Sequence, residues 1–174
     1  MMTKEQFQTP DKRLTAVCGL FCPACGLFIG TQDDPQRLQN RAAKMQQPIE
    51  DLQCDGCRAE RRSAYCRTCQ FVSCAAEKGI DFCGQCDDYP CDELKQFQAA
   101  RSHRIELWEA QERINAVGYE QWFSEMAEHY ACPQCQTINS AYDVRCRRCG
   151  ATPSCAYVGL HQAEITRYLS GQQG

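Results

Sequence analysis

Long hydrophobic runs and familiar enzyme motifs are missing from this sequence. No stretch approaches the roughly 18 apolar residues of a membrane-spanning helix, and no uninterrupted apolar segment of a secretory signal precedes Cys18. The patterns G-x-x-x-x-G-K-S/T, G-x-S-x-G and H-E-x-x-H do not occur either. We therefore expect a cytoplasmic protein and find nothing that favours an enzyme.

Positive charge is also in short supply. The formal net charge is -3, and each zinc ion bound by four thiolates adds a further -2, so three such sites would bring it to roughly -9. That sign is wrong for a general nucleic-acid binder. Arg145, Arg147 and Arg148 are the best nucleic-acid candidates, because only Asp143 opposes them between residues 132 and 153. Another protein is the expected partner, through the C-terminal segment or a helical surface.

Cysteine, by contrast, is abundant. It accounts for 16 of the 174 residues, roughly 9 per cent, a level typical of disulfide scaffolds or metal sites. In a reducing cytosol thiols do not settle as structural disulfides, and C-x-x-C pairs there bind metals or carry out redox chemistry. Metal ligation is the leading interpretation, with zinc as the expected ion.

The C-terminal cysteines give the most specific signal. The pairs are Cys132-Pro-Gln-Cys135 and Cys146-Arg-Arg-Cys149-Gly150. Each C-x-x-C turn presents two sulfurs to one ion at about 2.3 Å, so two turns complete a closed tetrahedron. This spacing predicts a zinc ribbon; a redox dithiol is the alternative. His129 lies nearby but is interpreted as a helix-end side chain, since cysteines are in surplus.

The cysteines between residues 54 and 91 leave no room for a conventional core, so metal must substitute for it. Residues 58–74 and 75–91 align without gaps, which indicates a duplicated knuckle. The simplest partition assigns one ion to Cys54, Cys57, Cys66 and Cys69, and another to Cys74, Cys83, Cys86 and Cys91. Interleaved partitions fit the spacing equally, although the members of a C-x-x-C usually share an ion.

A third group, Cys18, Cys22 and Cys25, has the spacing C-x-x-x-C-x-x-C. That spacing can seat three irons of a four-iron cluster, as in radical enzymes that use S-adenosylmethionine, but the chain is too short for the barrel those enzymes need. Three thiolates could instead close a site with a distant fourth, such as Cys155. Alone they would leave an open coordination position of the kind that catalytic and metal-transfer sites use.

Apolar residues at helical spacing predict helices where cysteine is sparse. Asp34 supplies an N-cap and Pro35 a first-turn proline for a helix over residues 35–46. Gly118 supplies a stop between two further helices. The other segments with this spacing are a short one at Leu94 and Phe97, one from Leu107 to Val117, an aromatic-rich one from Tyr119 to Tyr130, and a tail helix with His161, Ile165 and Leu169 on one face.

The order of cysteines resembles a known family. The matching residues are Cys18-Gly19-Leu20 with Cys22 and Cys25, Cys54-Asp55-Gly56-Cys57, Cys66 and Cys69 with Cys74-Ala75, and Cys83 and Cys86 leading to Tyr89-Pro90-Cys91. Over roughly residues 17 to 100 they resemble the prokaryotic cysteine-rich family called domain of unknown function 3795. The resemblance implies a bacterial or archaeal cytoplasmic protein that binds metal, and no reaction. One departure is Pro23, since the family's proline more often follows the third cysteine, here at Gly26.

Together these patterns predict a small metal-stabilised α+β fold, with a zinc-knuckle body, short helices and a C-terminal zinc ribbon. We expect residues 1–16 to be a flexible lead-in, residues 17–130 the cysteine-rich body and residues 131–174 the ribbon with its tail helix. The predicted function is that of a non-enzymatic zinc protein, structural or partner-binding. The alternatives are an iron-sulfur or redox protein using the Cys18, Cys22 and Cys25 triad, and an enzyme or metal carrier with an open three-thiolate site.

Overall fold

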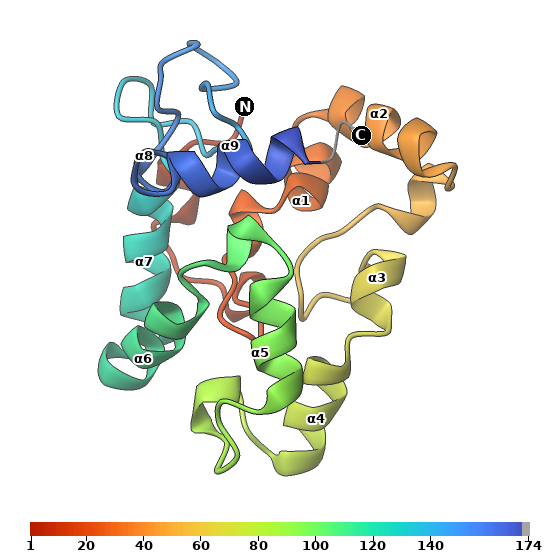
Figure 1. The fold of residues 1–174 in the computed structure, drawn as a ribbon, viewed down its shortest axis with the longest axis vertical. Coiled ribbons are helices and arrows are strands. Elements are labelled where there is room, and N and C mark those ends of the chain that lie inside the picture. The colour runs from red at the N-terminus through yellow and green to blue at the C-terminus, as the bar shows by residue number, and fades with distance from the viewer. Residues whose placement is uncertain (172–174) are drawn as a thin grey trace.

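The computed structural model describes residues 1–171, which form short helices joined by cysteine-bearing turns (Figure 1). The α-helices are α1 (Gly26–Gln32), α2 (Pro35–Met45), α3 (Ala64–Arg67), α4 (Gln70–Lys78), α5 (Asp92–Ala99), α6 (Leu107–Val117), α7 (Tyr119–His129), α8 (Ala156–Leu160) and α9 (Gln162–Ser170). Single turns of 3-10 helix are η1 (Lys4–Phe7), η2 (Lys12–Leu14), η3 (Cys22–Ala24), η4 (Ile49–Asp51), η5 (Cys83–Gln85) and η6 (Ser102–Arg104). None of the helices in this range is long and apolar enough to cross a membrane.

The predicted α+β class is wrong, because the described residues form no sheet. Extended pairing is limited to isolated bridges between Thr3 and Thr137, Thr15 and Phe21, and Ala131 and Ile138. A strand needs about five residues of extended backbone with partners on a neighbouring strand. Here the segments between cysteines form short helices and tight turns, so their amide groups bond mostly to nearby carbonyls.

The helices predicted from periodicity are confirmed. The Asp34 side chain accepts a hydrogen bond from the Arg37 amide at the start of α2, and Gln46 ends that helix in a left-handed conformation with φ 52°. Gly118, at φ 84°, separates α6 from α7, which therefore pack as an antiparallel pair on one side of the molecule (Figure 1). Local sequence thus sets the ends of these helices.

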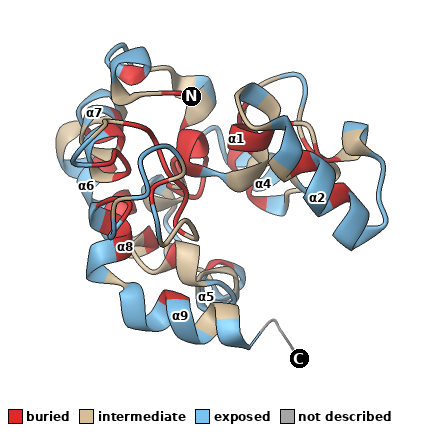
Figure 2. Ribbon diagram, turned by 90° about the horizontal axis from the view of Figure 1, so that it is seen from above, coloured by how far each residue is buried: buried red, intermediate tan, exposed pale blue. Residues whose placement is uncertain are grey.

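One main core joins all three predicted segments. Its members include Met2 and Phe7 from residues 1–16, Phe21, Trp122 and Phe123 from residues 17–130, and Ile138, Tyr157, Val158 and Ile165 from beyond residue 131. Figure 2 shows buried residues concentrated where α1 and α7 meet the turns between them. The stretch expected to be a flexible lead-in therefore contributes to the core, and residues on both sides of position 130 share it.

Gln111 ties α6 to two cysteine turns. Its side chain is fully buried; Nε2 donates to the Val17 carbonyl at 3.1 Å and Oε1 accepts from the Gly84 amide at 2.7 Å. Val17 and Gly84 adjoin Cys18 and Cys83. The two hydrogen bonds thus hold sequence-distant thiols at fixed positions beside α6.

Replacing Gln111 with leucine is expected to lower the free energy of unfolding by about 1–3 kcal/mol, because the Val17 carbonyl loses a buried donor and the half-buried Gly84 amide loses its acceptor. Urea denaturation of the metal-loaded protein measures this. Gln121→Leu, on the exposed face of α7, is the matched control and should change stability by less than about 0.5 kcal/mol. Equal effects for the two variants would contradict the role given to Gln111.

Candidate metal centres

The C-terminal cysteines converge as their spacing predicts. The sulfurs of Cys132, Cys135, Cys146 and Cys149 all lie within 4.8 Å of one another, and among the described residues this is the one group of possible ligands that does so. Cys132 Sγ is 3.6 Å from Cys149 Sγ, and Cys135 Sγ is 3.6 Å from Cys146 Sγ. At that separation no disulfide exists. Four sulfurs placed about 2.3 Å from one ion in a tetrahedron would be about 3.8 Å apart, so this donor set fits a tetrahedral metal.

Two equivalent backbone turns build this cluster, which we call the knuckle pair (residues 131–151). The Cys132 amide donates to the Thr137 carbonyl and the Cys146 amide to the Ala151 carbonyl. The residue after each pair donates back to the first cysteine, Gln136 to Cys132 and Gly150 to Cys146, both at 2.9 Å. The expected strands of a zinc ribbon are absent from these described residues, so the cluster consists of two knuckles without a sheet.

Local hydrogen bonds favour thiolate at two of these cysteines. Burial opposes ionisation of Cys135, but hydrogen bonds from the Thr137 hydroxyl and amide lower its pKa to about 6. Burial likewise opposes ionisation of Cys146, but the amides of Cys149 and Arg148 lower its pKa. Since metals bind the thiolate form, the turns prepare these sulfurs for ligation.

The residue after each pair has a left-handed backbone, with φ 59° at Gln136 and 77° at Gly150. This conformation costs a residue other than glycine about 1 kcal/mol or more in conformational free energy. No atom lies within 4 Å of a Cβ built on Gly150, so Gly150→Ala isolates the backbone effect. We expect Gly150→Ala to lower the midpoint of thermal unfolding and Gln136→Gly to raise it, each by about 1 kcal/mol in stability.

Scanning calorimetry of the metal-loaded variants measures both shifts. Gly171→Ala, at a glycine with φ -70°, is the control and should move the midpoint little. A stabilising Gly150→Ala would show that the second turn does not need its left-handed residue.

The knuckle pair is anchored to α1 by a buried ion pair. Arg147 Nη1 and Nη2 contact the two carboxylate oxygens of Asp33 at 2.6 and 2.9 Å, and Arg147 Nε donates to the Ile138 carbonyl. The side chains are only 6% and 11% exposed. Arg147, one of the three nucleic-acid candidates, is thus committed inside the protein, whereas Arg145 and Arg148 are exposed.

Several of the remaining cysteines interact with cysteines that are distant from them in sequence. A hydrogen bond from Cys66 lowers the pKa of Cys54 to about 6 and raises that of Cys66 itself. The Cys57 amide donates to Cys22 Sγ at 3.3 Å, and the thiolate charges of Cys22 and Cys25 interact with that of Cys54. We call Cys22, Cys25, Cys54 and Cys66 the Cys54 set.

Cys18 interacts with cysteines other than those of the Cys54 set. After burial, the charges of Cys57, Cys83 and Cys69 contribute to raising the pKa of Cys18. We call Cys18, Cys57, Cys69 and Cys83 the Cys57 set. The triad of Cys18, Cys22 and Cys25 is therefore divided between two neighbourhoods. Cys57 also interacts with Cys22 and Cys54, so the two neighbourhoods adjoin, and both the sequential and the interleaved partitions stay predictions.

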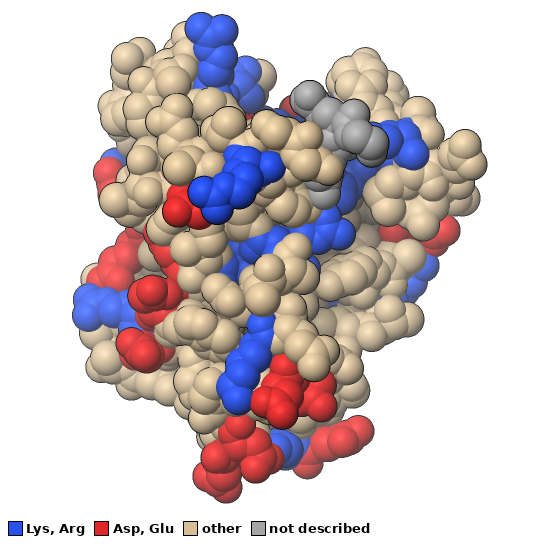
Figure 3. Space-filling view, viewed as in Figure 1, with Lys and Arg blue, Asp and Glu red and all other residues tan. Residues whose placement is uncertain are grey.

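The last four cysteines of this region surround a cavity of about 300 Å³. Cys74, Cys83, Cys86 and Cys91 line it, and we call them the Cys74 set; Cys83 also belongs to the Cys57 set. Lys78 Nζ lies 3.0 Å from Cys86 Sγ and 2.6 Å from an oxygen of Asp88. Figure 3 shows acidic side chains gathered at this end of the molecule, around the segment between α4 and α5.

The apparent duplication is not repeated in the structure. The arm before Cys66 is irregular between residues 58 and 63, whereas the corresponding arm before Cys83 contains the end of α4. The first knuckle lies on α3, while the second is the 3-10 turn η5. Similar residues thus adopt different backbones because their helical surroundings differ.

Two further groups lie outside the cysteine sets, and His129 is the last residue of α7, as predicted. Cys155 is 1% exposed in the main core, and burial raises the pKa of its thiol. The imidazoles of His129 and His161 both contact the Glu106 carboxylate, at 2.9 and 2.7 Å. Residues 106, 129 and 161 form no motif, so no sequence signal could have joined them.

The cysteine order that distinguishes this region extends from Cys18 to Cys91. Residues 14–96 match the family described as Protein of unknown function (DUF3795). The match confirms the resemblance seen in the cysteine pattern. No curated protein and no solved structure matches the chain. The DUF3795 segment therefore contains the Cys54, Cys57 and Cys74 sets, while the knuckle pair lies outside it.

Proposed function

We propose that this DUF3795 protein is a zinc-binding protein in which the knuckle pair is a closed structural site. The observation that supports this most is the tetrahedral spacing of Cys132, Cys135, Cys146 and Cys149. Four thiolates and no open position make a centre that stabilises folding and performs no chemistry. When bound there, zinc would supply a rigid cross-link between two turns that have no sheet to hold them.

The Cys54, Cys57 and Cys74 sets are proposed as further metal sites. Burial and then the neighbouring cysteines raise the pKa of Cys18, Cys22 and Cys83, and a bound cation would favour their thiolate forms. All the cysteines are free thiols, which supports a reducing compartment such as the cytoplasm. With no chemistry at closed sites, the proposed role is that of a partner-binding module whose surface, including the exposed Arg145 and Arg148 beside the knuckle pair, contacts another protein.

Elemental analysis of protein purified without oxygen tests the proposal. We expect roughly three to four zinc ions per chain and no iron. A variant carrying Cys135→Ser and Cys149→Ser should lose one zinc ion and keep the others. Zinc content that is near zero, or unchanged in the double variant, would contradict it.

A second candidate function is an iron-sulfur protein, which the cavity of the Cys74 set favours. These four thiols line a space of about 300 Å³ instead of converging on one point. An iron-sulfur cluster held by four cysteines occupies more room than one ion. A brown protein with several irons per chain, whose colour disappears in Cys86→Ser but persists in Cys135→Ser, would establish this function in place of the zinc-only one.

A further inference from the structure

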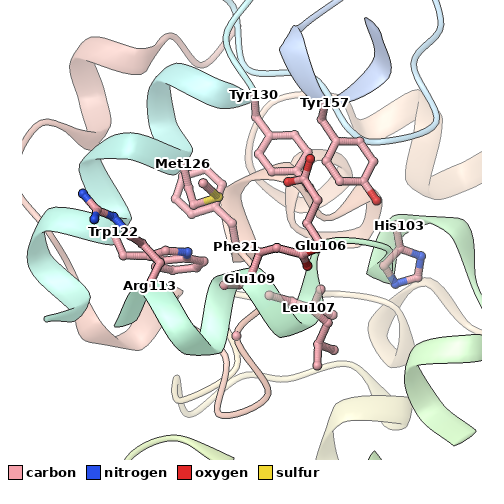
Figure 4. A pocket seen from close by; sticks show the side chains of 13 residues that line it. Phe21, His103, Glu106, Leu107, Glu109, Arg113, Trp122, Met126, Tyr130 and Tyr157 are labelled. Carbon is pink, nitrogen blue, oxygen red and sulfur yellow. The ribbon is translucent and has the colours of Figure 1, made fainter. Parts of the chain in front are cut away.

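A second cavity, of about 260 Å³, lies where η6, α6, α7 and α8 meet, and none of its described lining residues is a cysteine. Figure 4 shows the indole of Trp122 toward one end. The carboxylate of Glu106 lies toward the other, beside the paired rings of Tyr130 and Tyr157. The cavity brings the DUF3795 segment, through Phe21, together with the helices beyond it.

Carboxylates give this cavity a negative charge. Glu106 accepts hydrogen bonds from His129 at 2.9 Å and His161 at 2.7 Å. Burial opposes its ionisation, but these two imidazoles lower the pKa of Glu106. Glu109 adds a second carboxylate to the lining, while the Arg113 guanidinium is bound 2.6 Å from Glu125. His129 and His161 thus hold the Glu106 carboxylate in a fixed position at the cavity wall and favour its charged form.

Aromatic rings form the walls. Phe21 stacks on Tyr130 with ring centroids 5.9 Å apart, and Tyr130 stacks on Tyr157 at 5.1 Å, both at an interplanar angle of 19°. Trp122 meets Phe21 edge to face at 6.2 Å. These stacks cover both faces of Tyr130, so the rings supply an apolar wall, and the charge that selects a cation comes from the Glu106 carboxylate. An apolar wall beside a carboxylate favours a cation that carries carbon substituents over a fully hydrated ion.

One buried donor on the wall has no acceptor among the described residues. Trp122 is 1% exposed, and its Nε1 has no hydrogen-bond partner. Buried indole N–H groups are normally paired. Because the ring lines the cavity, an oxygen atom of a bound molecule would satisfy this donor.

We propose that this cavity binds a small organic cation that also bears an oxygen acceptor, of the amino-alcohol or quaternary-ammonium-alcohol class. The ammonium group lies beside the Glu106 carboxylate, its carbon substituents lie against the apolar wall, and the oxygen accepts from Trp122 Nε1. This site is separate from every cysteine set and adds small-molecule binding to the proposed metal-dependent role.

Calorimetric titration of the metal-loaded full chain with three probes tests the proposal. Choline carries both the cation and the oxygen, tetramethylammonium carries the cation alone, and 3,3-dimethylbutan-1-ol is the uncharged counterpart of choline. We expect choline to bind most tightly, tetramethylammonium less tightly, and the neutral alcohol at least about tenfold more weakly than choline. The proposal is overturned if the alcohol matches choline, or if choline shows no saturation up to about 10 mM.

Two variants assign the contacts. Glu106→Gln keeps the shape of the side chain and should reduce choline affinity to that of the neutral alcohol. Trp122→Phe should remove the advantage of choline over tetramethylammonium. Trp108→Phe is the control, because Trp108 packs on Tyr89 outside the cavity. All three should retain the wild-type zinc content. Unchanged choline affinity in a folded, zinc-loaded Glu106→Gln variant would refute the assignment.

Discussion

Cys132→Ser is expected to remove one zinc ion per chain and to unfold the knuckle pair. Binding of structural zinc by four thiolates is worth about 10–16 kcal/mol in small domains near neutral pH, and most of that free energy is folding free energy. Cys132 is fully buried in this structure, so a serine there leaves a poor ligand in the same place. Zinc content and amide hydrogen exchange over residues 131–151 measure the two effects.

Cys155→Ala is the matched control for this experiment. Cys155 is as buried as Cys132, but it belongs to the main core and to none of the cysteine sets. It should keep every zinc ion while lowering stability modestly. Equal zinc loss from the two variants would show that burial, and not ligation, explains the effect of Cys132→Ser.

Arg147→Ala is expected to lower the free energy of unfolding by about 3–5 kcal/mol, because it leaves the Asp33 carboxylate buried without its counter-charge. Arg148→Ala changes an exposed neighbour and should alter stability by about 0.5 kcal/mol or less. Urea denaturation of both metal-loaded variants provides the comparison. If the two variants are equally stable, the ion pair does not anchor the knuckle pair to α1.

The same ion pair predicts a pH dependence. Burial opposes ionisation of Asp33, but Arg147 and the Met2 amide lower its pKa below the usual value near 3.9. A lowered pKa means that the stabilisation is fully present above about pH 4 and is lost as the pH falls through the folded value. Asp33→Asn should remove this part of the acid dependence, measured as the difference in unfolding free energy between the two proteins.

The parts of the fold that were predictable are those decided by neighbours in sequence. The start of α2 at Asp34, the stop at Gly118 and the convergence of the four C-terminal cysteines all depend on spacings of a few residues. The absence of a sheet from residues 1–171 was not predictable in this way, because whether two extended stretches pair depends on the turns between them. Tight cysteine turns occupied the backbone that strands would have needed.

Spacing rules could not predict which cysteines between residues 18 and 91 lie near one another. Cys66 belongs to α3, whereas Cys69 is the N-cap of α4, so the positions of the two sulfurs depend on how two helices pack. Glu106, His129 and His161 meet only because α6, α7 and the α8–α9 turn share a core. Contacts of this kind are set by tertiary packing and leave no periodic trace in the sequence.

The bridge between Thr3 and Thr137 has a consequence for the order of folding. The Lys4 amide donates to the Gln136 carbonyl and the Ile138 amide to the Met2 carbonyl, both at 3.0 Å. A ribosome makes residues 2–4 well before their partners, which emerge only after the whole DUF3795 segment. Closing so long a loop is entropically unfavourable, so it must follow compaction of the intervening chain. Protection of residues 2–4 from proteolysis during translation therefore marks the chains in which the second half has already folded.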